Sequence, residues 1–233
     1  MPRIARVVFP GLPYHVTHRG NRRGEVFFEP KDRHVYKTWL SEYAAKYDLE
    51  VWAYCLMDNH IHLLVVGHQP DSLSLTLGRT HGRFAQWQNR RHEWSGHFWA
   101  NRFYSTPLDD RHLLAAVKYI ELNPVRAGFV EMAEEYEWSS ARPHAHGEAD
   151  SLLSPLRPFP SMVGNWSRFL ASGQEQQTVE ELRLNTSTGR PTGSKTFVAV
   201  LEARLGRTLR RKRRGPKPSA SKDEEVGGGP ANC

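Results

Sequence analysis

The chain is poor in cysteine and has no long apolar run, and both shortages restrict the class of protein to which it can belong. Its 233 residues include two cysteines, Cys55 within an apolar segment and Cys233 at the last position, so we expect no disulfide framework and a reducing compartment. No run of about 18 apolar residues occurs, which argues against a membrane-spanning helix. The first residues also lack the long apolar stretch of a secretory signal. We therefore expect a cytoplasmic protein without a membrane partner.

Acidic residues are outnumbered, and the excess positive charge is clustered. Lys and Arg total 32 against 25 Asp and Glu, which gives a net charge of +7 and a pI near 9.6. Aromatic residues such as Trp87, Trp94 and Phe103 lie among or beside the basic clusters. Cationic side chains suit phosphate contact and flat rings suit base stacking, so nucleic acid is the expected partner. The predicted DNA contacts are Arg22, Arg23, Arg79, Arg83, Arg102, Arg210, Arg211, Arg213 and Arg214.

The stretch Val51–Val66 predicts a β-hairpin with two histidines on its second strand. Asp58-Asn59 suits a two-residue turn, since both residue types tolerate positive φ. His60 and His62 then leave the same strand face, roughly 7 Å apart at Cα. In this register Met57 lies opposite His60, and Cys55 opposite His62. Two converging imidazoles could hold one divalent ion, although half-buried strand histidines are the simpler alternative.

The periodicity of the rest of the chain predicts an α+β fold. We expect a first strand over Pro13–Gly20, in which His15 and His18 cannot share a face, so we interpret both as structural or facing nucleic acid. A helix begins at Glu29-Pro30, and its apolar stripe marks a core face. The order β-α-β-β-α-β-α indicates a ferredoxin-like sheet with one added helix. The other expected elements are a helix from Ser72 to about Arg91, a last strand over His97–Ser105 and a helix starting at Asp109 or Asp110.

Composition changes near Gly147. We expect a catalytic domain over residues 1–147 and an extension with short helices over 148–206. Helical pieces are predicted at Ser161–Leu170, Thr178–Leu184 and Ser194–Leu205. Residues 207–233 read as a basic, disordered tail because they are polar, Gly-rich and carry a run of basic side chains.

The helix after Asp110 carries a second chemical pattern. Leu113, Val117 and Ile120 form its buried stripe, and Tyr119 and Asn123 lie on the flank, one helical turn apart. Asn123 could complete a metal site while Tyr119 stands beside it. The ion would polarise a phosphodiester, and tyrosine attack would conserve the bond energy as a phosphotyrosine. Alone, Tyr119 would be read as an ordinary half-buried helix residue.

These residues resemble a known family. His60-Ile61-His62 resembles the HUH motif of single-tyrosine DNA transposases, and KYIELNPVRAGFV (Lys118–Val130) resembles the tyrosine helix of the REP-associated tyrosine transposases. PYHVTHRGN, GHFWANRF, EWSS and TGRPTG add to the resemblance, which runs from about residue 8 to the basic tail.

The resemblance implies roles for particular residues. His60, His62 and Asn123 match the ligands of Mg²⁺ or Mn²⁺, and Tyr119 matches the nucleophile. The implied activity is cleavage and rejoining of single-stranded DNA beside imperfect hairpins, such as repetitive extragenic palindromes, through a 5′-phosphotyrosine and a free 3′-OH. We expect a monomer or homodimer with no obligatory protein partner.

Two other functions stay open at this point. A zinc hydrolase also uses H-x-H, but it would need further His or Asp ligands on later strands, and no H-x-H-x-D-H occurs. A hairpin-binding regulator could keep the fold and the basic surface without cutting. Cleavage that depends on Tyr119 separates these possibilities.

Overall fold

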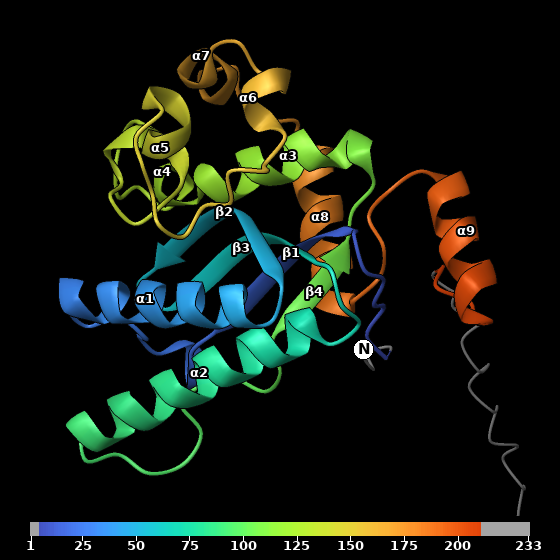
Figure 1. Cartoon of the computed structure of the whole chain (residues 1–233). Helices are drawn as coiled ribbons and strands as arrows, with labels where there is room; N and C mark the ends of the chain where they lie inside the picture. The colour runs from blue at the N-terminus through green and yellow to red at the C-terminus, as the bar shows by residue number, and fades with distance from the viewer. Residues whose placement is uncertain (1–4, 211–233) are drawn as a thin grey trace, which may run out of the picture.

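The computed structural model describes residues 5–210, and its centre is a four-stranded antiparallel sheet (Figure 1). The spatial order is β2-β3-β1-β4, which is the interleaved order of a ferredoxin-like sheet and confirms the predicted fold class. The strands are β1 (Pro13–Arg19), β2 (Leu49–Met57), β3 (His60–Gly67) and β4 (Tyr104–Pro107).

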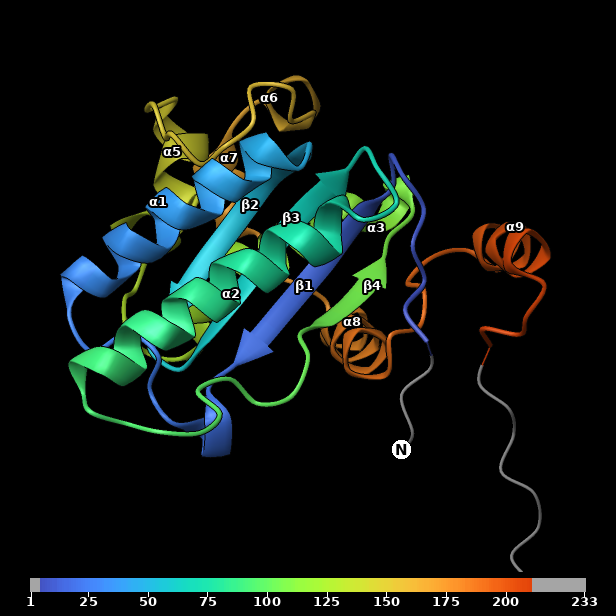
Figure 2. The same ribbon diagram turned by 60° about the horizontal axis from the view of Figure 1, so that its bottom comes forward.

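Two long helices, α1 (Pro30–Lys46) and α2 (Ser72–Arg91), cover one face of the sheet (Figure 2). The Asp32 carboxylate fixes the start of α1, because it accepts hydrogen bonds from the backbone N–H groups of Phe28 at 2.7 Å and Glu29 at 3.2 Å. Of the predicted stripe of α1, Tyr36, Leu40 and Ala44 are buried in the apolar core between these helices and the sheet, and Trp39 packs against it. Tyr43 and Tyr47 are half-buried outside that core. No helix within residues 5–210 is long and apolar enough to cross a membrane.

The opposite face is covered by α3 (Asp110–Glu121) and, farther along the chain, by α8 (Gln176–Thr188), which contacts β1, β4 and α3. Asp109 caps α3, since its side chain accepts a hydrogen bond from the His112 N–H at 3.1 Å. The predicted stripe of α3 is buried in a second core on this face, and the one-turn helix α4 (Asn123–Arg126) follows directly. The expected helix start and the helix end near Asn123 are both confirmed.

The extension is more helical than predicted. It contains α8, which runs for 13 residues, where the sequence indicated only Thr178–Leu184. The helix predicted over Ser194–Leu205 is present as α9 (Lys195–Leu205), with Ser194 as its cap, and its Leu201 packs on Val7 and Leu209. The remaining short elements are η1 (Asn21–Arg23), η2 (Ala133–Glu135), α5 (Ala141–His146), α6 (Phe159–Met162) and α7 (Trp166–Ala171). Of the predicted tail, the part after Arg210 lies outside the described residues.

Irregular chain lies along both outer strands of the sheet. On β2, Leu56 N–H donates to the Trp138 carbonyl at 2.8 Å, and Ser140 N–H donates to the Tyr54 carbonyl at 3.0 Å. On the other side, Thr192 N–H donates to the Pro107 carbonyl of β4 at 2.9 Å. Residues that follow the core elements therefore pair with both edges.

The last strand begins later than the sequence suggested. It starts at Tyr104 rather than His97, because Phe98 and Trp99 turn into the core beneath α2 and Asn101 takes a left-handed conformation with φ of 58°. Aromatic residues are common in strands, but burial against α2 decides the backbone of Phe98 and Trp99 here.

The hairpin turn also differs in detail. Asp58 and Asn59 form the turn, but neither is among the described residues with positive φ. Their carbonyls instead accept hydrogen bonds from the loop after β1: Val26 N–H reaches Asp58 at 2.7 Å and Gly20 N–H reaches Asn59 at 2.9 Å. These tertiary contacts hold the turn in a conformation without positive φ, which the Asp58-Asn59 sequence alone does not dictate.

Candidate active site

The hairpin register places both motif histidines on the sheet face that carries α3 and α8. Met57 lies opposite His60 and Cys55 opposite His62, as predicted. On the other side β3 pairs with β1, where Thr17 lies opposite His62 and Arg19 opposite His60. Directly opposed residues share a face, so alternate β1 residues, beginning with His15, join the histidines there.

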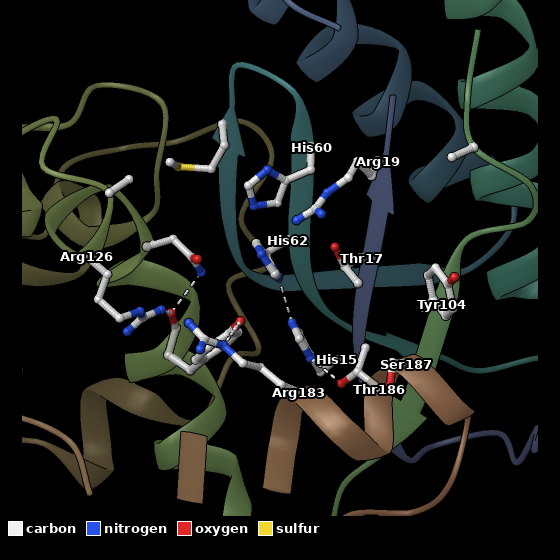
Figure 3. A pocket seen from close by; sticks show the side chains of 15 residues that line it. His15, Thr17, Arg19, His60, His62, Tyr104, Arg126, Arg183, Thr186 and Ser187 are labelled. Carbon is white, nitrogen blue, oxygen red and sulfur yellow. Dashed lines mark hydrogen bonds between the residues drawn. The ribbon is translucent and has the colours of Figure 1, made fainter. Parts of the chain in front are cut away.

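A cavity of about 540 Å³ opens between this sheet face, α3 and α8 (Figure 3). The four predicted catalytic and metal-binding residues line it together: His60, His62, Tyr119 and Asn123. Arg19, Arg126 and Arg183 add positive charge to its wall. One chain thus supplies every one of these groups.

Both motif imidazoles are held through one ring nitrogen. His62 Nδ1 lies 2.9 Å from His15 Nε2, and His60 Nδ1 lies 2.6 Å from Asn59 Oδ1. Within residues 5–210 the Nε2 atoms of His60 and His62 have no hydrogen-bond partner, and the two ring centroids are 4.9 Å apart. The two nitrogens are therefore the ones available to a ligand in the cavity.

Burial keeps these rings uncharged. It lowers the pKa of His60 to about 4, with a further contribution from nearby Arg19. The pKa of His62 falls well below its usual range, first through burial and then through His60 and His15. A neutral imidazole is the form that binds a metal, so both rings are ready ligands at neutral pH.

Tyr119 stands beside His62 in the same wall. Their ring centroids are 5.5 Å apart and nearly perpendicular. The phenol oxygen accepts a hydrogen bond from Arg183 Nε at 3.2 Å, and the Arg126 guanidinium carbon lies 4.4 Å from the ring centroid. Two cations therefore flank the side chain where a phosphate or a phenolate would carry negative charge.

Asn123 presents its amide in one orientation. Its Nδ2 group donates to the backbone carbonyls of Tyr119 at 2.9 Å and Ile120 at 3.2 Å. Carbonyls only accept, so the nitrogen must face them and the amide oxygen is left for another partner. Asn123 can occupy this position because α3 ends just before it, ahead of Pro124.

The donor set fits a divalent cation. It comprises two neutral imidazole nitrogens and one amide oxygen, with room in the cavity for phosphate or water. Across residues 5–210 no group of three or more His, Cys, Asp or Glu could hold a metal. The third ligand at this site would therefore have to be an amide or come from substrate, and the further ligands of a zinc hydrolase are not found in this part of the chain.

The cavity also holds residues that were not predicted, and four of them contact the predicted groups or His15. His15 was interpreted as structural or facing nucleic acid, but it bridges His62 and Thr186, whose Oγ1 lies 2.8 Å from His15 Nδ1. Arg126 lies within the tyrosine-helix motif, so the sequence did contain a signal for it. Arg183 and Thr186 lie in the extension, where nothing local indicates a role, and they line the cavity across the predicted boundary at residue 147.

The predicted DNA-contact arginines are spread over the surface. Arg22 and Arg23 are exposed just after β1, and Arg102 is exposed before β4. Arg79 and Arg83 lie on α2, behind the sheet, where Arg83 pairs with Glu42 at 3.0 Å. Arg210 pairs with Glu202 at 3.2 Å, and Arg211, Arg213 and Arg214 lie outside the described residues. Their contacts with DNA stay predictions.

Comparison with known proteins agrees with this fold. A sequence profile described as "Transposase IS200 like" matches residues 9–123, which include both histidines, Tyr119 and Asn123. A REP-associated tyrosine transposase of Haemophilus influenzae is 28% identical over 40% of this chain, and the match covers 60% of that relative's length. A solved REP-associated tyrosine transposase bound to a REP hairpin aligns with a TM-score of 0.54 and 18% identity, over 66% of this chain and 92% of the other.

Over residues 9–123, just under half of its length, the chain is similar to the IS200-like transposases. Within them, the relatives that it resembles are REP-associated tyrosine transposases.

Proposed function

We propose that this protein is a metal-dependent transposase that cuts and rejoins single-stranded DNA beside imperfect hairpins, with Tyr119 as its nucleophile. One observation carries the proposal. The Tyr119 ring lies 5.5 Å from the His62 ring in a cavity where two imidazole nitrogens are free, and Arg183 donates to the phenol oxygen.

The reaction follows from these groups. The Tyr119 oxygen attacks the phosphorus, the bond to the 3′ oxygen breaks, the phenol proton is lost to solvent, and the leaving 3′ oxygen takes up a proton. The products are a 5′-phosphotyrosine and a free 3′-OH, and the reverse reaction rejoins the strand without another energy source. Arg126 and Arg183 neutralise the charge on the phosphate and on the phenol oxygen as the bond forms.

His60, His62 and Asn123 would hold Mg²⁺ or Mn²⁺. The cation supplies Lewis-acid polarisation of the phosphate. Imidazole nitrogen suits Mn²⁺ better than Mg²⁺, so we expect tighter binding of Mn²⁺.

The hairpin substrate is inferred from relatives and from charge. One matched structure is described as bound to a REP hairpin, and the cavity of this chain is lined by arginines. Arg22, Arg23 and Arg102 are exposed on segments next to β1 and β4, where a strand leaving the cavity could be contacted.

The test is a covalent-adduct assay. Purified protein with Mn²⁺ or Mg²⁺ is mixed with labelled single-stranded hairpin DNA taken from repeats beside its gene, and denaturing gels are probed for a protein–DNA band. We expect a band that disappears with EDTA and in Tyr119→Phe. Cleavage that survives Tyr119→Phe would indicate a metal hydrolase that uses water. Tight binding without cleavage, across metals and hairpins, would indicate a regulator.

A further inference from the structure

Helix α8 lies outside the matched family segment, yet it reaches the centre of the site. The family profile ends at residue 123, whereas α8 spans Gln176–Thr188. Two α8 residues, Arg183 and Thr186, project into the cavity from successive turns (Figure 3). Arg183 contacts Tyr119, and Thr186 contacts His15.

The second contact forms part of a buried chain of hydrogen bonds. Thr186 Oγ1 lies 2.8 Å from His15 Nδ1, and His15 Nε2 lies 2.9 Å from His62 Nδ1. Thr186 is 2% exposed and His15 1%. Water therefore has little access to these atoms, and each link must be made by the groups themselves.

Each of these two hydrogen bonds contains one hydrogen atom, so the pair of bonds can point in either of two directions. In the first order, His62 Nδ1–H donates to His15, and His15 Nδ1–H donates to Thr186. In the second order every hydrogen is reversed, and the remaining proton of His62 then sits on Nε2, which faces the cavity. Only the first order leaves a lone pair on His62 Nε2, and that lone pair is what a cation needs.

We propose that Thr186 is a positioning residue, which accepts the His15 hydrogen bond and thereby holds His62 in the tautomer that binds the metal. This inference rests on the proposed function, since His62 has to be a ligand. It assigns α8 a part in the active site through a hydroxyl that never touches the ion.

The energetic consequence concerns the metal-loaded state. Without the Thr186 hydroxyl, the loaded protein would keep a buried His15 N–H with no acceptor. The metal-free protein could reverse the order, which replaces the unpaired N–H of His15 by an unpaired nitrogen lone pair, the less costly of the two. Loss of the hydroxyl therefore weakens metal binding. Loss of a direct partner of a ligating histidine usually costs about 10–100-fold in affinity, and we expect the same range for Thr186, which acts on His62 through His15.

The experiment measures Mn²⁺ binding without DNA, by titration of the free-ion signal in electron paramagnetic resonance. Thr186→Val keeps the side-chain shape and removes the oxygen, and we expect it to bind Mn²⁺ about 10–100-fold more weakly than the wild type. Thr186→Ser restores the acceptor and should bind within about threefold of wild type. Thr188→Val is the matched control, because the Thr188 hydroxyl donates to the Leu184 carbonyl of its own helix at 2.9 Å. It should leave Mn²⁺ affinity unchanged.

A second measurement needs no variant and holds even if Thr186→Val fails to fold. Long-range ¹H–¹⁵N spectra of wild-type protein loaded with diamagnetic Mg²⁺ should show protons on Nδ1 of both His15 and His62. A loaded protein with His15 unprotonated at Nδ1 overturns the inference, and so does wild-type Mn²⁺ affinity in folded Thr186→Val.

His62→Phe separates this inference from the proposed function. If His62→Phe binds Mn²⁺ as tightly as wild type, the proposed metal site is wrong and the role of Thr186 falls with it. If His62→Phe loses Mn²⁺ while Thr186→Val keeps it, only the inference is wrong.

Discussion

Two pairs of buried histidines lie on opposite faces of the same sheet, and they differ in one respect. His15 and His62 are joined at 2.9 Å on the cavity face, and His18 and His81 are joined at 2.9 Å on the face under α2. All four rings are 5% exposed or less. Exposure and spacing therefore do not distinguish a ligand from a structural histidine.

The ring nitrogens make the distinction. In the second pair every nitrogen has a partner, because His18 Nε2 lies 3.1 Å from the Asn101 carbonyl and His81 Nε2 lies 2.9 Å from the Tyr36 hydroxyl. In the first pair, His62 Nε2 is left facing the cavity. A satisfied network stabilises the fold, whereas a network with one free nitrogen can bind a ligand.

The largest difference between the two networks should appear when the same substitution is made in each. His62→Phe should lower Mn²⁺ affinity by more than about 100-fold and abolish the covalent adduct. His81→Phe should leave both within about twofold, since its ring touches no part of the cavity wall. Calorimetric Mn²⁺ titration and the adduct assay measure the two effects. Equal loss in both variants would mean that the networks are not functionally distinct.

Low pH should destabilise the metal-free protein strongly. Burial lowers the pKa of His15 to about 3 and of His60 to about 4, and it places the pKa of His62 and His81 well below the usual range. Between about pH 6.5 and 4 the unfolded chain binds protons that the folded chain does not, so stability falls as pH drops, by up to about 1.4 kcal/mol per pH unit for each imidazole. Above about pH 7 these groups contribute no slope.

Urea unfolding at pH 7.5, 6 and 5 measures this dependence. His81→Phe should reduce the slope, because it removes one of the four imidazoles whose pKa is lowered. A stability that is flat from pH 7.5 to 5 would contradict the buried, neutral state of both networks.

The two substitutions should rank in the opposite order for stability and for metal binding. His81→Phe leaves the His18 nitrogen and the Tyr36 hydroxyl unpaired, and each buried group left without a partner costs about 1–3 kcal/mol. His62→Phe removes the partner of a single His15 nitrogen. We therefore expect His81→Phe to lower the free energy of unfolding more than His62→Phe does in the absence of metal, as measured by urea titration at pH 7.5.

Arg183 should affect chemistry without affecting the metal. Its Nε donates to the Tyr119 oxygen, and the hydrogen bonds of the two motif histidines within residues 5–210 go to His15 and Asn59 instead. Arg183→Gln should slow adduct formation by about 10–100-fold at unchanged Mn²⁺ affinity, and Arg183→Lys should lie in between because it keeps the charge but loses the planar donor. Unchanged adduct rates in Arg183→Gln would mean that α8 takes no part in the chemical step.

The smallest effects concern the surface charges. Replacing Arg22 or Arg23 by Gln should reduce the slope of log affinity against log salt for single-stranded DNA by about 0.7 each. Arg83 pairs with Glu42 behind the sheet, so Arg83→Gln should leave the slope unchanged. The sequence also predicted a DNA contact for Arg83, and an equal change in Arg83→Gln would support that prediction by placing DNA on the α1–α2 face.

The local pattern of the sequence was enough for much of the fold and for the centre of the site. Alternation placed His60 and His62 on one strand face, helical spacing placed Tyr119 and Asn123 on one helix flank, and Asp109 marked the helix start. These inferences succeed because the groups lie within a few residues of one another, where geometry is fixed by the backbone period.

Long-range contacts account for what was missed. His15 and Thr186 are 171 residues apart, and no periodicity relates two such positions. The β1–β3 register, which brings His15 onto the face of His62, could not be derived from either strand alone. The late start of β4 has the same origin, since Phe98 and Trp99 follow the core under α2 rather than their strand propensity.

The segments along the outer strands bear on how the protein behaves at high concentration. Unpaired strand edges can pair with strands of other molecules and are the usual starting points of edge-to-edge aggregation. Here Trp138 and Ser140 occupy part of the β2 edge and Thr192 part of the β4 edge. All three lie beyond residue 123, so a chain trimmed to the matched family segment would expose both edges and should precipitate or form fibres where the full chain does not.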